Sequence, residues 1–587
     1  MALRRSPFPN GLVAGLHAAG WVLIFPCFWF LDQLIAVCVS TSLERNRRLE
    51  KECYLHPLKV VFGSLVFFVL FLIAAPIAFL GFLLWAPLQA VRRPFSYHEE
   101  VPSIPVEDRN QGWKEAGKVT FGFVTANVCL LPNGLARFNN LGHTQRRATA
   151  IGRYIVQGAT RPHIRIFVDS PSSCGSTLSP SSSLMPQAAS CSYGATESQP
   201  QGCGDPSPEP DATLSQSNSN RDVAVSVPLD DAKEPHPLPS ANSNQNSNQQ
   251  GDRSRRKLPR AFEALGWDTD VVLEVSTLFP ASVDFVCLEE VFDKRAAQKL
   301  KQALGPLFGH VLYDVGVYAC QPVGGCSSFK FFNSGLFVAS RYPLVEAEYR
   351  CFPNGRGEDA LAAKGLLCVK VLIGLQDEIE RKLVGYFNCT HLHAPEGDGT
   401  IRHEQLDMLM KWISEFQLAN KEDNELVLFD VLCGDLNFDN CSPDDALEQG
   451  HDLFDVYRDF CRDGPGKEKP WVIGTLLEQP SLYDDDTKTP ENLQRVLEIE
   501  ELRKQYLSPP VAKPGIPIVY PESGQTWVGR RLDYILYRES TIAKNCQTEV
   551  DEFTYVTQLA GLTDHIPVGL RLNVTFSSEE TGETPQN

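Results

Sequence analysis

Apolar runs in this chain repeatedly meet short polar clusters. Five such clusters are Thr-Ala-Asn127, Cys-Leu-Glu-Glu290, Thr-His391-Leu-His393, Cys-Gly-Asp435-Leu-Asn437 and Gly-Leu-Thr-Asp564-His565. The apolar runs predict buried strands of a layered α/β fold, in which side chains at strand ends gather at one edge of a sheet. We therefore expect these polar residues to stand at the C-terminal ends of strands and to share one site. Such a set of groups suits a hard divalent cation and the hydrolysis of a phosphate ester.

The same patterns predict the other elements. Strands are expected at 118–127, 163–169, 283–290, 310–314, 335–340, 365–372, 383–391, 427–435, 531–537 and 566–573. Helices are expected at 144–157, 293–304, 402–416 and 490–506. The third helix places Leu406, Leu409 and Ile413 on one face, which is typical of a helix packed on a sheet. The mixture of strands and helices predicts the α/β class.

Two apolar segments near the N-terminus, 11–31 and 60–91, contain no Asp, Glu, Lys or Arg, and each is long enough to cross a bilayer. The basic residues around them are Arg4, Arg5, Arg45, Arg47, Arg48, Lys51, Arg92 and Arg93. If both segments spanned, the middle basic group would lie opposite the outer two, against the positive-inside tendency. Re-entrant hairpins bent at the prolines keep all the basic groups on the cytosolic face. We predict this arrangement, with two full spans as the alternative.

Composition restricts the function classes. The formal net charge of −18 argues against a nucleic-acid binder, which normally has a basic surface. The 17 cysteines, an odd number without paired short spacings, indicate reduced thiols rather than a disulfide framework. Glycosylation sequons at Asn388 and Asn440 adjoin the His391 and Asp435 clusters, where glycans would obstruct chemistry. Both observations favour a cytosolic catalytic region.

Changes in composition predict the organisation of the chain. We expect a membrane-inserting region at 1–93, a connector at 94–117, a catalytic domain in two parts at 118–169 and 261–573, an insertion at 170–260 and a tail at 574–587. The insertion is rich in Ser, Pro, Asn and Gln. It holds too few large apolar residues to offset chain entropy, so we predict that it is disordered, as is the tail.

In this order, the clusters resemble the endonuclease/exonuclease/phosphatase superfamily, whose fold is a DNase I-like four-layer α/β sandwich. The Gly-Asp435-Leu-Asn437 and Thr-Asp564-His565 motifs carry most of that resemblance. Longer segments are similar to the membrane-anchored vertebrate neutral sphingomyelinases. These are Pro-Phe-Pro-Asn at the N-terminus, Ala-Asn-Val-Cys-Leu-Leu-Pro, Glu-Val-Phe-Asp-Lys-Arg-Ala-Ala, Tyr-Asp-Val-Gly-Val-Tyr and Gly-Leu-Thr-Asp-His-Ile-Pro-Val. The resemblance covers essentially the whole chain except the insertion.

This resemblance implies a Mg²⁺-dependent phosphodiesterase, with Mn²⁺ as a possible substitute, that hydrolyses sphingomyelin in a bilayer to ceramide and phosphocholine. It also implies stimulation by anionic phospholipids such as phosphatidylserine. The catalytic domain is expected on the cytosolic side of the Golgi or the inner plasma membrane, with a mitochondria-associated membrane as the alternative. Nucleic acid is not an expected partner, and the oligomeric state stays open.

Chemistry and the superfamily agree on the roles of the site residues. Glu290 is the expected metal ligand, and Asp564 approaches the metal. Asn127 supports the metal or a phosphate oxygen. His391 contacts the phosphate as negative charge develops, and Asn437 also binds the phosphate.

Asp435 is expected to position the attacking water, and His565 is the expected general base, oriented by Asp533. Which of Asp435 and His565 takes the proton stays open. His393 is expected to be only a hydrogen-bonded residue of the rim, because one histidine suffices for the phosphate contact.

Regulation is implied at three places. Asp359-Ala-Leu-Ala-Ala-Lys364 matches the family's allosteric Asp/Lys switch, for which a surface ion pair is the alternative interpretation. Anionic lipid is expected to bind Arg45, Arg47, Arg48, Arg92 and Arg93. Cys53 and Cys326 are the candidate acylation sites, although Cys320 and Cys326 are not adjacent as the family's second pair is.

Two other functions compete with this one. A phosphoinositide phosphatase of the same superfamily would need a basic pocket, which the net charge disfavours. A catalytically inert membrane scaffold would need a broken motif, and none of the motifs is broken.

Overall fold

The computed structural model describes residues 3–50, 55–104, 118–161, 255–257, 271–319, 329–376, 381–518, 527–539 and 546–576. The predicted strand at 163–169, most of the insertion, the end of the tail, Cys53 and Cys326 lie outside the described residues.

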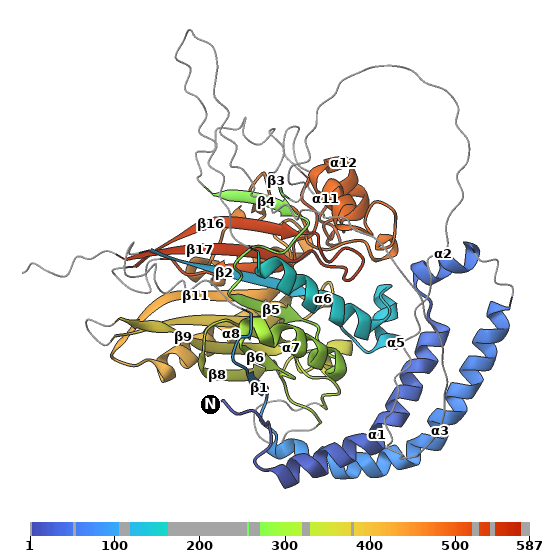
Figure 1. Cartoon of the computed structure of the whole chain (residues 1–587). Coiled ribbons are helices and arrows are strands. Elements are labelled where there is room, and N and C mark those ends of the chain that lie inside the picture. Colours follow the sequence, from blue (N-terminus) through green and yellow to red (C-terminus); the bar gives the residue numbers. More distant parts are fainter. Residues whose placement is uncertain are drawn as a thin grey trace, which may run out of the picture. The chain divides into compact units, whose positions relative to one another are not determined.

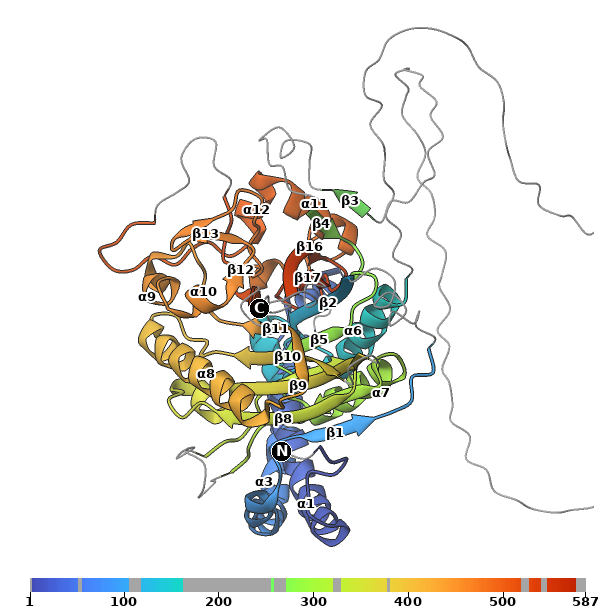
Figure 2. The same ribbon diagram turned by 90° about the vertical axis from the view of Figure 1, so that its left-hand side faces the viewer.

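Two sheets form the centre of the described domain (Figures 1 and 2). The larger has the order β1 (Ser96–Glu99), β6 (His310–Tyr313), β7 (Phe337–Ser340), β5 (Phe285–Glu289), β2 (Lys118–Asn127), β17 (Val568–Phe576), β16 (Cys546–Val556), β4 (Val272–Ser276) and β3 (Arg255–Lys257). The smaller has the order β12 (Arg458–Asp459), β15 (Asp533–Tyr537), β11 (Glu425–Asp435), β10 (Arg381–His391), β9 (Gly365–Gln376) and β8 (Leu344–Cys351). A short hairpin pairs β13 (Arg462–Gly464) with β14 (Lys467–Glu468).

Helices cover the outer faces of both sheets (Figure 2). On the larger sheet lie α6 (Thr144–Ala159) and α7 (Lys294–Phe308), and on the smaller sheet lies α8 (Gly399–Asn420). The largest apolar core lies between the sheets and includes Phe123 and Phe285 of one and Phe387 of the other. The α/β class and the four-layer sandwich are therefore confirmed.

The remaining helices are short or N-terminal. They are α1 (Gly11–Cys38), α2 (Ser42–Glu50), α3 (His56–Leu88), α5 (Asn133–Ala136), α9 (Ala446–Gln449), α10 (Leu453–Val456), α11 (Pro490–Glu498) and α12 (Glu500–Tyr506). The predicted helix over 490–506 is thus two helices, because Ile499 adopts an extended conformation (φ −111°, ψ 118°) between them.

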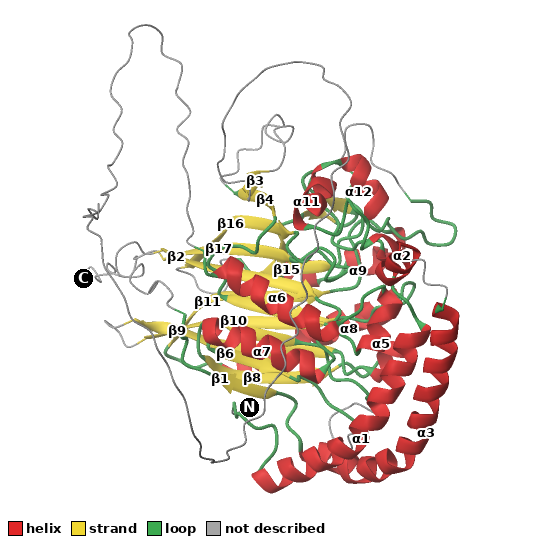
Figure 3. Ribbon diagram, turned by 45° about the vertical axis from the view of Figure 1, so that its right-hand side comes forward, coloured by secondary structure: helices red, strands yellow, loops and turns green. Residues whose placement is uncertain are grey.

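The two predicted membrane segments form α1 and α3, a pair of adjacent antiparallel helices (Figure 3). Among the described helices, these two are long and apolar enough to cross a membrane. Each runs continuously through its prolines, Pro26 in α1 and Pro76 and Pro87 in α3. Each segment is therefore one continuous helix, and whether the pair re-enters or spans a bilayer stays a prediction.

Candidate active site

Strand register brings the predicted polar residues to one edge of the stacked sheets. In the smaller sheet, β10 and β11 run parallel and pair His391 with Asp435, while antiparallel β15 pairs Asp533 with Asp435. In the larger sheet, parallel β2 and β5 pair Asn127 with Glu289. Gly434, before Asp435, is required there, because its φ is +147° and a Cβ would lie 1.9 Å from the Thr390 carbonyl oxygen.

A hydrogen bond joins the two sheets at this edge. The Asn127 Nδ2 donates to Asp435 Oδ2 at 2.9 Å, and both side chains are buried. The backbone N–H of Asn437 donates to Asp435 Oδ1 at 2.9 Å. Asn437 lies beyond the end of β11 with φ +54°, so the prediction that it shares the strand edge with Asp435 is wrong. Its side chain reaches the site through the bend and donates to the Leu392 carbonyl oxygen at 3.0 Å.

His565 and Asp533 form a hydrogen-bonded pair. The His565 Nδ1 lies 2.8 Å from Asp533 Oδ2, and its Nε2 lies 3.9 Å from Asp435 Oδ2. Burial alone would lower the pKa of His565, but the charges of Asp533, Asp435 and Asp564 raise it well above 6.5. With Nδ1 directed at Asp533, Nε2 is the nitrogen that faces the rest of the site.

The position of His565 in the chain differs from the prediction. Asp564 and His565 lie in the loop between β16 and β17, and Asp533 begins β15, so none of the three stands at the C-terminal end of a strand. They reach the site because β15 and β17 are antiparallel to neighbours whose C-terminal ends carry Asp435 and Asn127.

Glu290 has the properties of a metal ligand. It directly follows β5 in a left-handed conformation (φ 58°), a strained geometry for glutamate that is common at functional sites. Its Oε2 is buried and has no hydrogen-bond partner among the described residues. Burial and the nearby Asp564 carboxylate raise the pKa of Glu290. A buried carboxylate oxygen without a donor fits a bound cation.

Asp564 is held from the long segment between β11 and β15. The Gln479 Nε2 donates to Asp564 Oδ2 at 3.1 Å. Thr563, one residue earlier, donates its hydroxyl to the Asn127 carbonyl oxygen at 2.7 Å. Sequence reasoning missed Gln479, because it lies in an irregular segment without an apolar run to mark it.

His391 is buried and neutral. Burial and the charge of Lys364 lower its pKa well below 6.5. Among the described residues, neither ring nitrogen has a hydrogen-bond partner, and Nε2 lies 3.6 Å from Asp435 Oδ2. An imidazole held without a partner at this edge is available to a substrate oxygen.

Asp359 and Lys364 form a buried pair beside the histidines rather than a surface ion pair. The Lys364 Nζ lies 2.9 Å from Asp359 Oδ2 and donates to the Leu392 carbonyl oxygen at 2.9 Å. Burial would raise the pKa of Asp359, but Lys364, His393 and the backbone N–H of Ala394 hold it far below its usual value. Lys364 thus lies close enough to influence His391, Glu290 and Asp435.

His393 is the hydrogen-bonded residue that was expected. It is fully buried, with Nε2 at 2.9 Å from Asp398 Oδ2 and Nδ1 at 3.2 Å from Asp359 Oδ2. Because both ring nitrogens face carboxylates of the protein, His393 is poorly placed to contact substrate.

The basic residues assigned to lipid differ in exposure. Arg45 and Arg47 of α2 are exposed, whereas Arg92 is buried. The Arg92 guanidinium contacts Asp314 Oδ2 at 2.8 Å and the Gly316 carbonyl oxygen at 2.8 Å. Its position favours a structural role over headgroup binding.

Comparisons with known proteins identify the family. Residues 12–91 match the model of the neutral sphingomyelinase N-terminal transmembrane region, and residues 241–565 match that of the endonuclease/exonuclease/phosphatase family. Sphingomyelin phosphodiesterase 5 of Danio rerio is 66% identical over 580 residues, 99% of this chain and 100% of the relative. The chain belongs to the sphingomyelin phosphodiesterase family.

Other proteins are less similar. Sphingomyelin phosphodiesterase 3 of Mus musculus is 42% identical over 99% of this chain and 100% of its own length. Among solved structures, the crystal structure of SmcL is 19% identical, covers 54% of this chain and 90% of its own, and has a TM-score of 0.28.

Proposed function

We propose that this protein hydrolyses the phosphodiester of sphingomyelin at a membrane surface, giving ceramide and phosphocholine. The observation that carries the proposal is the meeting of Glu290, Asp435, His391 and the Asp533–His565 pair at one sheet edge, in a chain whose relatives are named sphingomyelin phosphodiesterases. That set holds a metal ligand, a base and a phosphate contact, which is what phosphodiester hydrolysis requires.

The residues fit a divalent cation, which we propose is Mg²⁺. Glu290 would hold it through its unpartnered Oε2, and Asp564 lies near enough to contribute. When bound, Mg²⁺ polarises phosphate oxygens and adds positive charge that favours the neutral form of His565. Mg²⁺ normally takes only one or two carboxylates and keeps waters, in agreement with this small donor set.

The protein's own groups divide the remaining chemistry. His565 accepts the proton of the attacking water at Nε2, and Asp533 orients the ring and stabilises the imidazolium. Asp435, held by Asn127 and the backbone of Asn437, positions that water. His391 contacts the phosphate oxygen on which negative charge develops, together with Asn437.

Membrane attachment and regulation complete the proposal. Helices α1 and α3 keep the site at the bilayer, so the search for a lipid substrate becomes two-dimensional. The exposed arginines of α2 bind anionic lipid from the cytosolic side. The Asp359–Lys364 pair acts as the switch, since any movement of Lys364 changes the charge beside His391.

The test is headgroup release by purified full-length protein in vesicles. Sphingomyelin, phosphatidylcholine and phosphoinositides are compared, with and without phosphatidylserine, in Mg²⁺ and in EDTA. We expect phosphocholine release from sphingomyelin that requires Mg²⁺ and rises with phosphatidylserine. Phosphate release from phosphoinositides without cleavage of sphingomyelin would overturn the proposal.

A further inference from the structure

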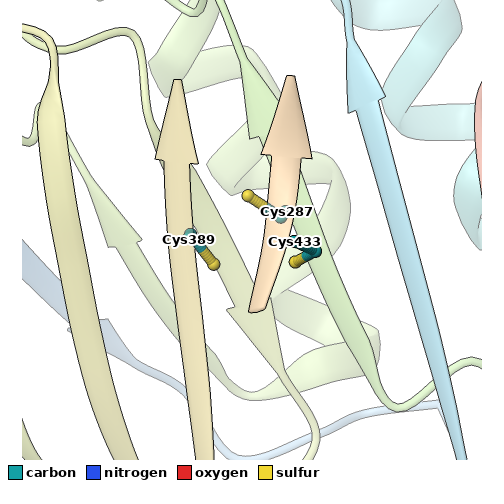
Figure 4. A group of neighbouring side chains, drawn as sticks. All are labelled: Cys287, Cys389 and Cys433. Carbon is teal, nitrogen blue, oxygen red and sulfur yellow. The ribbon is translucent and has the colours of Figure 1, made fainter. Parts of the chain in front are cut away.

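Three cysteines form a second cluster of ligand atoms in the centre of the sandwich. Cys287 of β5, Cys389 of β10 and Cys433 of β11 converge there from the two sheets (Figure 4). Their Sγ atoms all lie within 4.8 Å of one another, and all three residues are fully buried. Cys389 and Cys433 are register partners in the parallel β10–β11 pair, so two of the sulfurs are held by directly facing backbones.

A buried carboxylate adjoins one of the three thiols, that of Cys287. Glu289 lies two residues after Cys287 on the same face of β5, and its Oε1 accepts from Cys287 Sγ at 3.0 Å and from Thr125 Oγ1 at 2.7 Å. The other oxygen, Oε2, is buried and has no hydrogen-bond partner among the described residues. A fully buried, unsatisfied carboxylate oxygen is costly, and it points to a ligand that the protein atoms do not supply.

We propose that Cys287, Cys389, Cys433 and Glu289 bind a thiophilic divalent cation, for which Zn²⁺ is the natural probe. The three sulfurs supply three of the four ligands that Zn²⁺ takes in closed sites, and Glu289, beside Cys287, is the candidate for the fourth. Sulfur donors select zinc-like metals over Mg²⁺, whereas the ligands proposed at the rim, Glu290 and Asp564, offer oxygen. The chain would therefore hold two metal ions, one bound mainly by sulfur and the other bound by oxygen.

The thiols are prepared for a cation. Burial raises the pKa of a thiol, but hydrogen bonds from Cys287 and Cys389 bring the pKa of Cys433 down to about 6. The S–H of Cys287 is directed at Glu289 Oε1. Binding of a cation to the sulfurs requires them as thiolates, and the protons they lose pass to solvent.

A second group of candidate ligand atoms lies equally close together but is unsuited to binding a metal. His403, Asp407 and His451 also place ligand atoms within 4.8 Å of one another. However, the His451 Nδ1 accepts the backbone N–H of Leu453 at 2.9 Å, so the proton of the neutral ring sits on Nε2, which faces Asp407 at 3.4 Å. That nitrogen has no lone pair for a metal. The cysteine cluster has no such obstacle.

The cysteines lie between the sheets, just inside the edge that carries the polar site residues. Cys389 and Cys433 precede His391 and Asp435 by two residues, so each pair projects from the same face of its strand. A cation bound between the sheets would tie β10 and β11 to β5, the strand that ends beside Glu290. Its role is to position those side chains, and it takes no part in the reaction.

The test uses full-length protein stripped of metal and titrated with Co²⁺. Thiolate ligation gives a near-ultraviolet sulfur-to-cobalt charge-transfer band, which the carboxylate ligands proposed at the rim do not give. We expect one equivalent of Co²⁺ to develop the band and Zn²⁺ to displace it. Cys433→Ser should weaken the band, because it removes one of the three thiolates, and Glu289→Gln should weaken Co²⁺ binding by about tenfold.

Two variants serve as matched controls. Cys368→Ser changes a buried cysteine of the neighbouring β9 that lies in a different apolar core, and Glu290→Gln removes the ligand of the rim; both should keep the band. X-ray absorption on Zn²⁺-loaded wild-type protein needs no variant and should show sulfur neighbours at about 2.3 Å. A shell of oxygen and nitrogen only, or a band unchanged in Cys433→Ser, would leave the three cysteines as ordinary core thiols.

Discussion

The N-terminal helices and the sandwich are both built from apolar runs, yet they bury them differently. In α3, Phe62 is 67% exposed and Leu80 63%, whereas Phe123 in β2 is 1% exposed. The sandwich covers its apolar residues with a second sheet and helices. The helix pair leaves them for another solvent, which by length and composition is a bilayer. The comparison separates attachment from chemistry within one chain.

The two regions meet through an aromatic cluster that includes Trp85 and Tyr318, and through polar contacts. Asp32 of α1 accepts the backbone N–H of Gly134 at 2.6 Å, and the Arg137 guanidinium donates to the Val39 carbonyl oxygen at 2.9 Å. A charged residue in a membrane helix normally has a partner and a function, and here the partner is the segment that follows β2. Different residues therefore serve membrane attachment and catalysis, although the two regions are in direct contact.

Glu290→Gln is expected to have the largest effect on catalysis while leaving membrane attachment unchanged. If Glu290 holds the metal, its loss should reduce sphingomyelin hydrolysis on the order of 10³-fold. Vesicle binding should be unchanged, because α1 and α3 are untouched. Headgroup release and vesicle flotation measure the two properties side by side. Glu358→Gln, at an exposed glutamate, is the control; retained activity in Glu290→Gln would refute the metal assignment.

Asp533→Asn should lower kcat about 100-fold, because the amide no longer stabilises the imidazolium of His565. Membrane binding should again be preserved. Single-turnover kinetics on sphingomyelin vesicles measure the chemical step. A raised KM with an unchanged kcat would contradict the orienting role of Asp533.

Asp359→Asn tests whether the lipid signal reaches the site through Lys364. Removing the carboxylate leaves a buried ammonium without its ion-pair partner, so the ratio of phosphatidylserine-stimulated to basal rate should change about tenfold. Rates with and without phosphatidylserine give that ratio. Identical basal and stimulated rates in the variant and the wild type would eliminate the switch.

Gly81→Leu tests the attachment side. A Cβ at Gly81 would lie 2.7 Å from the Leu23 Cβ and 2.8 Å from the Gly20 carbonyl oxygen, where the two helices cross closely. Overpacking should destabilise the helix pair by about 2 kcal/mol. Protease protection in vesicles should fall, while hydrolysis of sphingomyelin in detergent micelles persists. Gly15→Leu, where a Cβ meets nothing within 4 Å, should change neither.

The last prediction concerns stability at the junction of the two regions, without an effect on catalysis. Burial opposes ionisation of Asp314, but Arg92 and Lys294 lower its pKa from 3.8 to about 2. The pair therefore stabilises the fold above pH 3.8, and this contribution disappears as the pH falls through 2. Asp314→Asn should lower the free energy of unfolding by about 2 kcal/mol at pH 7. Chemical denaturation should show that this difference between variant and wild type disappears in acid. A difference independent of pH would exclude the ion pair as its cause.

Local patterns predicted β2, β5, β9, β10 and β11, since each is an apolar run with a clear end. They missed β4, β8 and β16, whose apolar residues are interrupted by charged ones. The positions of Asn127, Glu290, His391 and Asp435 followed directly. Those of Asn437 and His565 did not, because a bend with positive φ and a loop between antiparallel strands leave no periodic signal. No local pattern marks Gln479, because its role depends on a contact with Asp564, 85 residues further along the chain.

The sequence by itself determined the α/β class, the two membrane-length helices and the residue types of the site, because these depend on hydrophobic period, length and side-chain chemistry. Only the tertiary structure decided that the Asp359–Lys364 pair is buried beside His391, and that three cysteines from two sheets meet beneath the catalytic edge. Such contacts depend on the register and stacking of strands far apart in the chain, and register is set by the whole core rather than by any local segment.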